Sequence, residues 1–247
     1  MATARRGAAR IRSSPVERGA SSLSIPSVIA IDGPVASGKT TVGLALAERL
    51  GYRLVDTGAM YRAVTHLALS KGVPHDDVAA LAALAEATHI DIVSARERGG
   101  PQRVLANGVD VTDHLRTPEV ESAVSIVSKV ARVRDAMVEQ QRRMADEGRT
   151  VMVGRDIGTV VLRAAGMKVF LVASVEERAK RRFAEVMAKG GRQTLDAVRE
   201  NLAMRDKLDS EREVSPLRPA EDAIRIDTDP LTIEQVVERI LRLAREW

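Results

Sequence analysis

The amino-acid sequence predicts an α/β fold, with a five-stranded parallel sheet at its core and helices on both faces. Short apolar runs recur along the chain, separated by segments whose apolar residues have helical spacing. One apolar run leads into a glycine-rich loop at residues 33–41, and a helix-like run follows that loop. Strands that alternate with helices form parallel sheets covered on both faces, which is the predicted architecture.

The five strands are expected where short apolar runs stop at a turn-forming or capping residue. Each run is followed by Asp, Gly or Ser, as is typical of a strand end. The predicted strands are residues 28–31, 52–55, 150–153, 167–173 and 223–226.

The helices are expected between these strands, where apolar residues recur every three or four positions. Pro118 suits the first turn of a long helical stretch, which we expect to break near Ala131. Ser174–Glu177 and Thr232–Gln235 match the capping box that opens a helix. The predicted helical segments are 42–50, 60–68, 76–88, 118–148, 174–190, 194–212 and 232–241.

A small antiparallel patch is predicted inside this α/β alternation. Residues 90–93 alternate between apolar and polar side chains, and 104–111 is a hairpin pattern around Asn107-Gly108. Asn-Gly favours the tight turn that joins two antiparallel strands. We therefore expect an inserted β subdomain between the second and third strands of the main sheet.

Composition and charge exclude several classes of protein and site. The chain contains no cysteine, which excludes disulfides, thiol chemistry and Cys-based zinc sites. No apolar run is long enough to span a membrane. The net charge is +4, yet residues 1–26 alone hold five arginines against one glutamate, also +4. The remainder is near neutrality, so we expect no nucleic-acid partner.

The basic start of the chain, residues 1–26, is predicted to be a disordered extension outside the folded domain. A start codon placed too early would produce the same pattern. An Arg- and Ser-rich, acid-poor segment also resembles an organellar transit peptide, which stays an alternative.

The glycine-rich loop matches the phosphate-binding pattern of glycine, four residues, then Gly-Lys-Ser/Thr. Successive backbone N–H groups and the helix start can surround the phosphates of a nucleoside triphosphate, and Gly33 and Gly38 allow a close approach. Lys39 supplies a cation to the β- and γ-phosphates, and the Thr40 hydroxyl suits Mg²⁺. The predicted ATP-binding residues are Gly33, Pro34, Val35, Ala36, Ser37, Gly38, Lys39, Thr40 and Thr41.

Arginines recur where this topology would place a phosphate acceptor, at and beyond the carboxyl ends of the strands. Guanidinium groups suit a site crowded with phosphates, because they are always charged and bind two oxygens at once. The alternatives are that each arginine lies on a solvated helix face or in a weak surface ion pair, that Thr57 simply caps a helix, and that Asp156 is a turn or cap residue. The arginines in question are Arg62, Arg134, Arg155, Arg178, Arg181, Arg182, Arg205 and Arg212.

The chain resembles the bacterial cytidylate kinases in five stretches, which are IAIDGPVASGKTT, LVDTGAMYR, GRDIGTVV, ERAKRR and RDKLDSEREVSPL. The resemblance covers about residues 27–247. It implies transfer of the ATP γ-phosphate to CMP or dCMP with Mg²⁺, by a cytoplasmic enzyme expected to be a monomer without membrane attachment. It also implies the nucleoside-monophosphate kinase fold. Its parts would be a core (27–56, 150–175 and 220–247), an acceptor-binding region with the β insertion (57–149) and a lid (176–192).

The resemblance assigns roles to residues that match the family's motifs. Acceptor binding falls on Thr57, Tyr61, Arg62 and Arg155, recognition of cytosine on Ser125, Arg134 and Asp156, and binding of the sugar on Arg205 and Asp209. The residues implied in catalysis are Lys39, Arg155, Arg178, Arg182 and Arg212, of which Arg178 and Arg182 would be lid arginines that close on ATP.

The sequence departs from the family pattern at two places. Val153 stands where an acidic residue usually precedes Gly-Arg-Asp, so we expect water held by Asp32 or Asp156 to serve the metal instead. Residues 162–166 replace a common Phe-Pro stretch, which concerns a loop. The rival hypotheses are a phosphate-loop kinase acting on AMP, UMP or shikimate, a nucleotide-dependent switch or ATPase, and a nucleic-acid-binding protein using the basic start.

Overall fold

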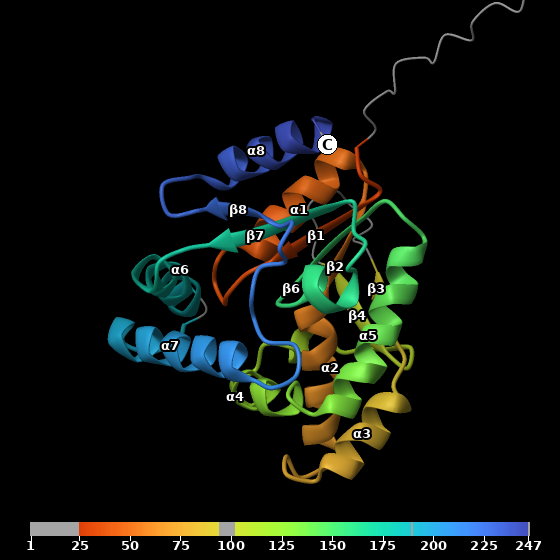
Figure 1. Ribbon diagram of the computed structural model, residues 1–247. Coiled ribbons are helices and arrows are strands. Elements are labelled where there is room, and N and C mark those ends of the chain that lie inside the picture. The colour runs from red at the N-terminus through yellow and green to blue at the C-terminus, as the bar shows by residue number, and fades with distance from the viewer. Residues whose placement is uncertain (1–24, 94–101, 189, 247) are drawn as a thin grey trace, which may run out of the picture.

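A five-stranded parallel sheet forms the centre of the computed structural model, which describes residues 25–93, 102–188 and 190–246. The predicted extension therefore lies outside the described residues, apart from its last two positions. The strand order is β2-β6-β1-β7-β8 (Figure 1). The strands are β1 (Val28–Asp32), β2 (Arg53–Asp56), β6 (Thr150–Gly154), β7 (Met167–Val172) and β8 (Ile224–Asp227), each within two residues of its predicted bounds.

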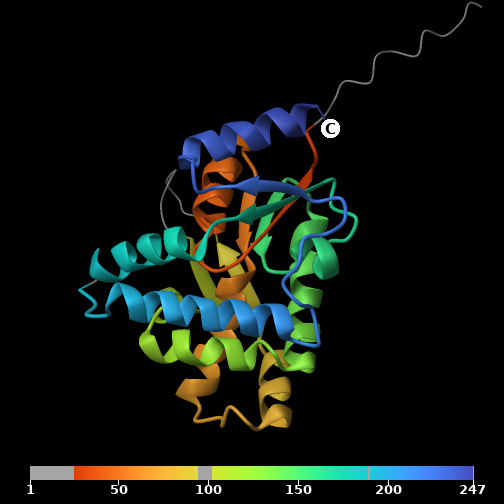
Figure 2. The same ribbon diagram turned by 60° about the vertical axis from the view of Figure 1, so that its left-hand side comes forward.

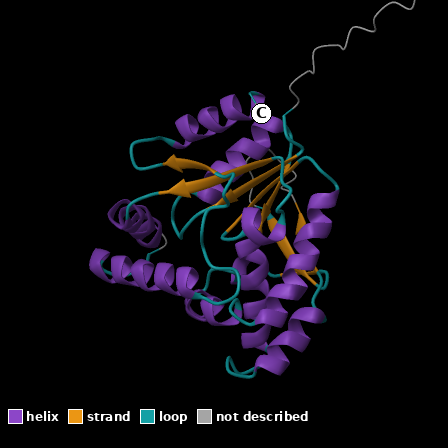
Figure 3. Ribbon diagram, viewed as in Figure 1, coloured by secondary structure: helices purple, strands orange, loops and turns teal. Residues whose placement is uncertain are grey.

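Helices cover both faces of this sheet, as the strand–helix alternation predicts (Figure 3). On one face, Ile29 and Ile31 pack with the apolar residues of α1 (Lys39–Leu50) and α8 (Ile233–Arg245). On the other, Ala30 packs with α2 (Thr57–Ser70) and α5 (Ala131–Asp146). Alternate residues of one strand thus enter two separate cores.

The insertion is confirmed as a three-stranded antiparallel sheet of β3 (Ile90–Val93), β4 (Arg103–Ala106) and β5 (Val109–Asp110). Asn107 and Gly108 join β4 to β5 with φ angles of 50° and 80°, the left-handed values that this tight turn requires. Residues 94–101, between β3 and β4, lie outside the described residues.

The helices around the insertion differ slightly from their predicted bounds. The helix expected at 76–88 is α3 (Val78–Glu86), because the Asp77 side chain accepts the Ala80 N–H and starts the helix there. The break expected near Ala131 is confirmed, since α4 (Pro118–Val127) ends three residues before α5 begins.

Two antiparallel helices, α6 (Val175–Ala188) and α7 (Leu195–Glu211), form a hairpin that projects from the core, with α7 running beside α4 (Figure 2). Ala179, Val198 and Leu202 give the hairpin its own small apolar cluster. Within the residues described, no helix is both long enough and apolar enough to cross a membrane.

One of the two predicted capping boxes is complete and the other is half formed. Thr232 and Gln235 exchange both hydrogen bonds at the start of α8. At α6, the Glu177 N–H donates to Ser174 Oγ, but the Ser174 N–H donates to the Asp229 carboxylate. The predicted reciprocal bond was therefore wrong. Asp229, 55 residues away, takes that donor, and Glu177 pairs with Arg181 instead.

Candidate functional site

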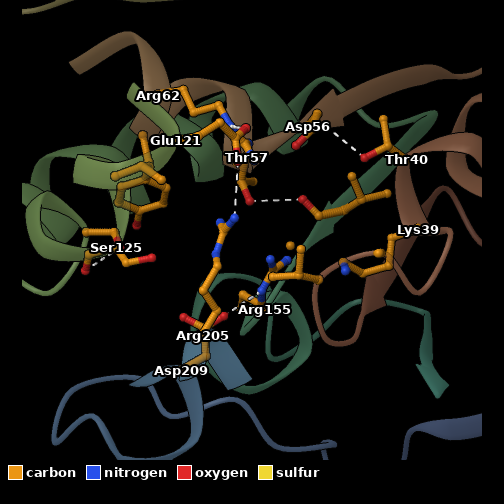
Figure 4. A pocket seen from close by; sticks show the side chains of 18 of the residues that line it. Lys39, Thr40, Asp56, Thr57, Arg62, Glu121, Ser125, Arg155, Arg205 and Asp209 are labelled. Carbon is orange, nitrogen blue, oxygen red and sulfur yellow. Dashed lines mark hydrogen bonds and ion pairs between the residues drawn. The ribbon is translucent and has the colours of Figure 1, made fainter. Parts of the chain in front are cut away.

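A cavity of about 240 Å³ opens where β1, β2 and β6 end, beside the glycine-rich loop (Figure 4). Most of the predicted site residues line it together, although they come from six helices and three loops. They are Val35, Ala36, Gly38, Lys39, Thr40, Thr41, Thr57, Tyr61, Arg62, Ser125, Arg134, Arg155, Asp156, Arg182, Arg205, Asp209 and Arg212. Gly33, Pro34, Ser37 and Arg178 are predicted site residues that do not line it.

The glycine-rich loop has the backbone geometry that phosphate binding requires. Gly33 has φ of 152°, and a Cβ there would lie 2.3 Å from the carbonyl oxygen of Leu171. Gly38 has φ of 88° and immediately precedes the first turn of α1. Only glycine tolerates both positions without strain, so the loop closes tightly and the helix start faces the cavity.

The Lys39 side chain folds back onto its own loop. Its ammonium donates hydrogen bonds to the Pro34 carbonyl and, at 3.4 Å, to Ser37 Oγ. Burial, followed by the nearby Arg155 cation, lowers the pKa of Lys39 well below its ordinary value. An anionic phosphate beside Lys39 would reverse that effect, so the charged lysine is suited to a bound triphosphate.

Asp56 is the carboxylate that contacts the predicted magnesium ligand. The Thr40 hydroxyl donates to Asp56 Oδ2 at 2.9 Å, and both groups line the cavity. Val153 is the register partner of Asp56 on the neighbouring strand β6, and its Cγ1 lies against Gly43 of α1. A hydroxyl and a carboxylate are hard oxygen donors of the kind that Mg²⁺ prefers. In the sequence, only the position of Asp56 at the end of a predicted strand pointed to this role.

The two carboxylates expected to hold water for the metal are engaged elsewhere. Asp32 accepts the backbone N–H groups of Ile157 and Gly158, each at 2.8 Å, and so fixes the short helix η2 (Ile157–Val161). Burial raises the pKa of Asp32 to about 6, against the opposing effect of these two hydrogen bonds. Asp156 forms an ion pair with Arg134.

Arg134 and Asp156, the pair predicted to recognise cytosine, form a buried ion pair at 2.5 Å. Their side chains are 3% and 6% exposed, and the guanidinium of Arg134 stacks 5.3 Å from the centre of the Tyr61 ring. Arg212 approaches the other Asp156 oxygen at 3.8 Å, and Ser125 lines the same end of the cavity.

Several buried polar atoms at this end find no hydrogen-bond partner among the described residues. They include Tyr61 Oη, Arg134 Nε and Arg212 Nη2. A buried donor without a partner is costly, by about 1–3 kcal/mol each. The cavity therefore suits a polar ligand that accepts hydrogen bonds from these groups.

The remaining arginines meet two carboxylates across the cavity. Arg155 pairs with Asp209 at 2.9 Å. Arg62, Arg205 and Arg182 all contact Glu121, at 3.1, 3.1 and 3.5 Å. Burial opposes ionisation of Glu121, but the three arginines together lower its pKa to about 2. Sequence reasoning missed Glu121, since an acidic residue in a first helical turn is expected on helix-dipole grounds alone.

Arg178 lies outside the cavity and holds the hairpin against the glycine-rich loop. Its guanidinium makes two hydrogen bonds to Asp206, at 2.6 and 3.1 Å, and one to the Val35 carbonyl at 3.2 Å. Its implied role of closing on ATP stays a prediction. Arg182, in contrast, reaches the cavity from the same helix.

Comparison with known proteins places this chain in a family. A family model described as cytidylate kinase matches residues 29–246. The chain is 53% identical over 218 residues to the cytidylate kinase of Geobacillus sp. (strain WCH70), covering 88% of this chain and 96% of that protein. It is 49% identical over 218 residues to the cytidylate kinase of Bacillus subtilis (strain 168), with the same coverage. The chain therefore belongs to the cytidylate kinase family.

Proposed function

We propose that this protein transfers the γ-phosphate of ATP to CMP or dCMP, giving ADP and CDP or dCDP. The observation that carries the proposal is the buried Arg134–Asp156 pair, which faces the cavity beside the phosphate-binding loop. A carboxylate can accept a hydrogen bond from the amino group of cytosine, and a guanidinium can donate hydrogen bonds to its ring nitrogen and carbonyl.

One end of the cavity binds ATP and the other end binds the acceptor nucleotide. The loop N–H groups and Lys39 bind the ATP phosphates, while Arg62 and Arg155 orient the acceptor phosphate towards them. The acceptor phosphate is already an anion, so it attacks without a general base. Arg182 and Arg212 neutralise the charge that spreads over the transferred group. The hairpin of α6 and α7 excludes water from the cavity, so that the acceptor phosphate, and not water, attacks the γ-phosphate of ATP.

Mg²⁺ is the expected partner of ATP, and it would neutralise the β- and γ-phosphate oxygens. The Thr40 hydroxyl and the Asp56 carboxylate, 2.9 Å apart at the start of α1, are the oxygen donors that fit it. Asp56 would contribute directly or through water, because Mg²⁺ usually keeps several water ligands. We also infer a cytoplasmic monomer, since one chain supplies both halves of the cavity and the substrates are cytoplasmic metabolites.

A coupled assay with ATP and one acceptor at a time tests the proposed reaction. We expect CMP and dCMP to have kcat/KM values at least about 10²-fold above UMP and AMP, because a wrong base leaves the buried pair unsatisfied. UMP presents a carbonyl where cytosine has its amino group, and that carbonyl would face the Asp156 carboxylate. If UMP or AMP exceeds CMP, the assigned base recognition is wrong.

Replacing Asp56 with asparagine should raise the Mg²⁺ concentration needed for half-maximal activity by about tenfold, because one hard anionic donor is lost. The measurement is a Mg²⁺ titration at saturating ATP and CMP. Asp76→Asn, an exposed carboxylate outside the cavity, is the matched control and should leave the titration unchanged. An unaltered Mg²⁺ requirement in Asp56→Asn would remove Asp56 from the metal site.

A further inference from the structure

Glu121, in the first turn of α4, contacts arginines from three other helices. Its Oε1 accepts Arg62 Nε of α2 at 3.1 Å, and its Oε2 accepts Arg205 Nη1 of α7 at 3.1 Å. Arg182 of α6 approaches the same Oε2 at 3.5 Å. The Glu121 side chain is only 15% exposed, so the contacts are shielded from solvent. One carboxylate thus connects the acceptor side of the cavity to both helices of the hairpin. Figure 4 shows Glu121 with Arg62 and Arg205.

The atoms used in these contacts leave much of each guanidinium available to a ligand. Arg62 reaches Glu121 through Nε, and its two Nη atoms donate to no other residue within the described ranges. Arg205 uses Nη1, and its buried Nε finds no partner in the described part of the chain. Glu121 therefore occupies one side of each group and leaves donors that a phosphate or sugar oxygen can take.

Charge repulsion gives this carboxylate a specific effect. Three guanidinium groups that converge on one partly buried point repel one another, and Arg155 adds to the positive potential at Arg205. A carboxylate among them offsets the repulsion and holds each group in one orientation. Without it, the arginines would separate until a substrate phosphate drew them together, and that reorganisation would weaken binding.

We infer that Glu121 is a positioning residue for the acceptor nucleotide. It holds Arg62 with its Nη atoms towards the acceptor phosphate. It also fixes the positions of Arg182 and Arg205 of the hairpin relative to Arg62. The inference rests on the proposed kinase function. A carboxylate that competed with the phosphate would occupy the Nη end of Arg62, whereas Glu121 contacts Nε.

Glu121→Gln tests this role because it removes the charge and keeps the size. We expect KM for CMP to rise about tenfold, with KM for ATP within about twofold of wild type, since the lost interactions serve acceptor binding, and we expect a smaller fall in kcat through Arg182. Calorimetric titration of CMP into the free protein should show the same weakening. Glu119→Gln is the matched control, being exposed on the same helix two residues earlier, and it should leave both quantities unchanged.

Glu121→Asp separates positioning from simple loss of structure. The shorter side chain keeps the charge, so we expect a KM for CMP between those of wild type and Glu121→Gln. If Glu121→Gln fails to fold, the raised KM for CMP of Glu121→Asp is the result that tests the inference. An unchanged or lower KM in Glu121→Gln, or an equal shift in Glu119→Gln, would overturn the inference. If the wild-type protein fails to phosphorylate CMP, the proposed function is refuted. The inference about Glu121 is tested separately, by the KM of each variant relative to an active wild type.

Discussion

Replacing Lys39 with alanine should nearly abolish phosphoryl transfer while the protein stays folded. The ammonium lies at the first residue of α1, beside the loop N–H groups, where no other lysine lines the cavity formed by the described residues. Loss of one such preorganised charge lowers kcat on the order of 10³-fold, because the charge acts where the transition state develops its own. The coupled ATP–CMP assay measures this loss.

The fold should survive the change, because Lys39 is held by hydrogen bonds to its own loop and its charged form is already disfavoured by burial. Thermal unfolding should shift by only a few degrees relative to wild type. Lys39→Met retains the buried side-chain volume and should be equally inactive. Lys71→Ala, at an exposed position after α2, should keep full activity. Transfer by Lys39→Ala near the wild-type rate would show that the donor site is wrongly assigned.

Replacing Asp156 with alanine should damage both stability and acceptor recognition. Removal of one partner from a buried ion pair costs about 3–5 kcal/mol, because the remaining charge is left uncompensated, here on Arg134 and in part on Arg212. The same substitution removes the acceptor proposed for the cytosine amino group, so kcat/KM for CMP should fall by at least about 10²-fold. Urea unfolding and steady-state kinetics measure the two effects separately.

The double substitution Arg134→Met with Asp156→Leu distinguishes the two roles of the pair. Buried ion pairs replaced by apolar residues of similar size often recover stability, so the double variant should unfold at a higher urea concentration than Asp156→Ala. It should remain poor with CMP, because neither group that reads the base is present. Recovery of CMP activity together with stability would show that the pair serves the fold alone.

The parts of this fold that depend on short stretches of chain were predictable from the sequence. The turn at Asn107-Gly108, the break before Ala131 and the cap at Thr232 were all found as expected, since each depends on neighbours within a few residues. The strand positions were found within two residues for the same reason, because apolar runs and their polar ends are local patterns.

Contacts between distant segments were not predictable in the same way. Glu121 joins Arg62 and Arg205 across 59 and 84 residues, and no local pattern distinguishes it from Glu119, which is exposed two positions earlier. The Asp229 carboxylate displaced a predicted capping partner of Ser174 across 55 residues. Asp32 was expected near the metal, yet it serves two backbone N–H groups 125 and 126 residues away.

The α/β fold, the phosphate-binding loop and the arginines that predict a phosphate acceptor site could all be found from the sequence. Those features follow from residue type and spacing, which set backbone geometry and charge within one or two turns. The contact between Asp56 and Thr40, and the contacts of Glu121 with three arginines, were found only in the folded structure. The pairing of charges depends on which strand and helix ends the fold brings within about 4 Å of one another, and no single segment carries that information.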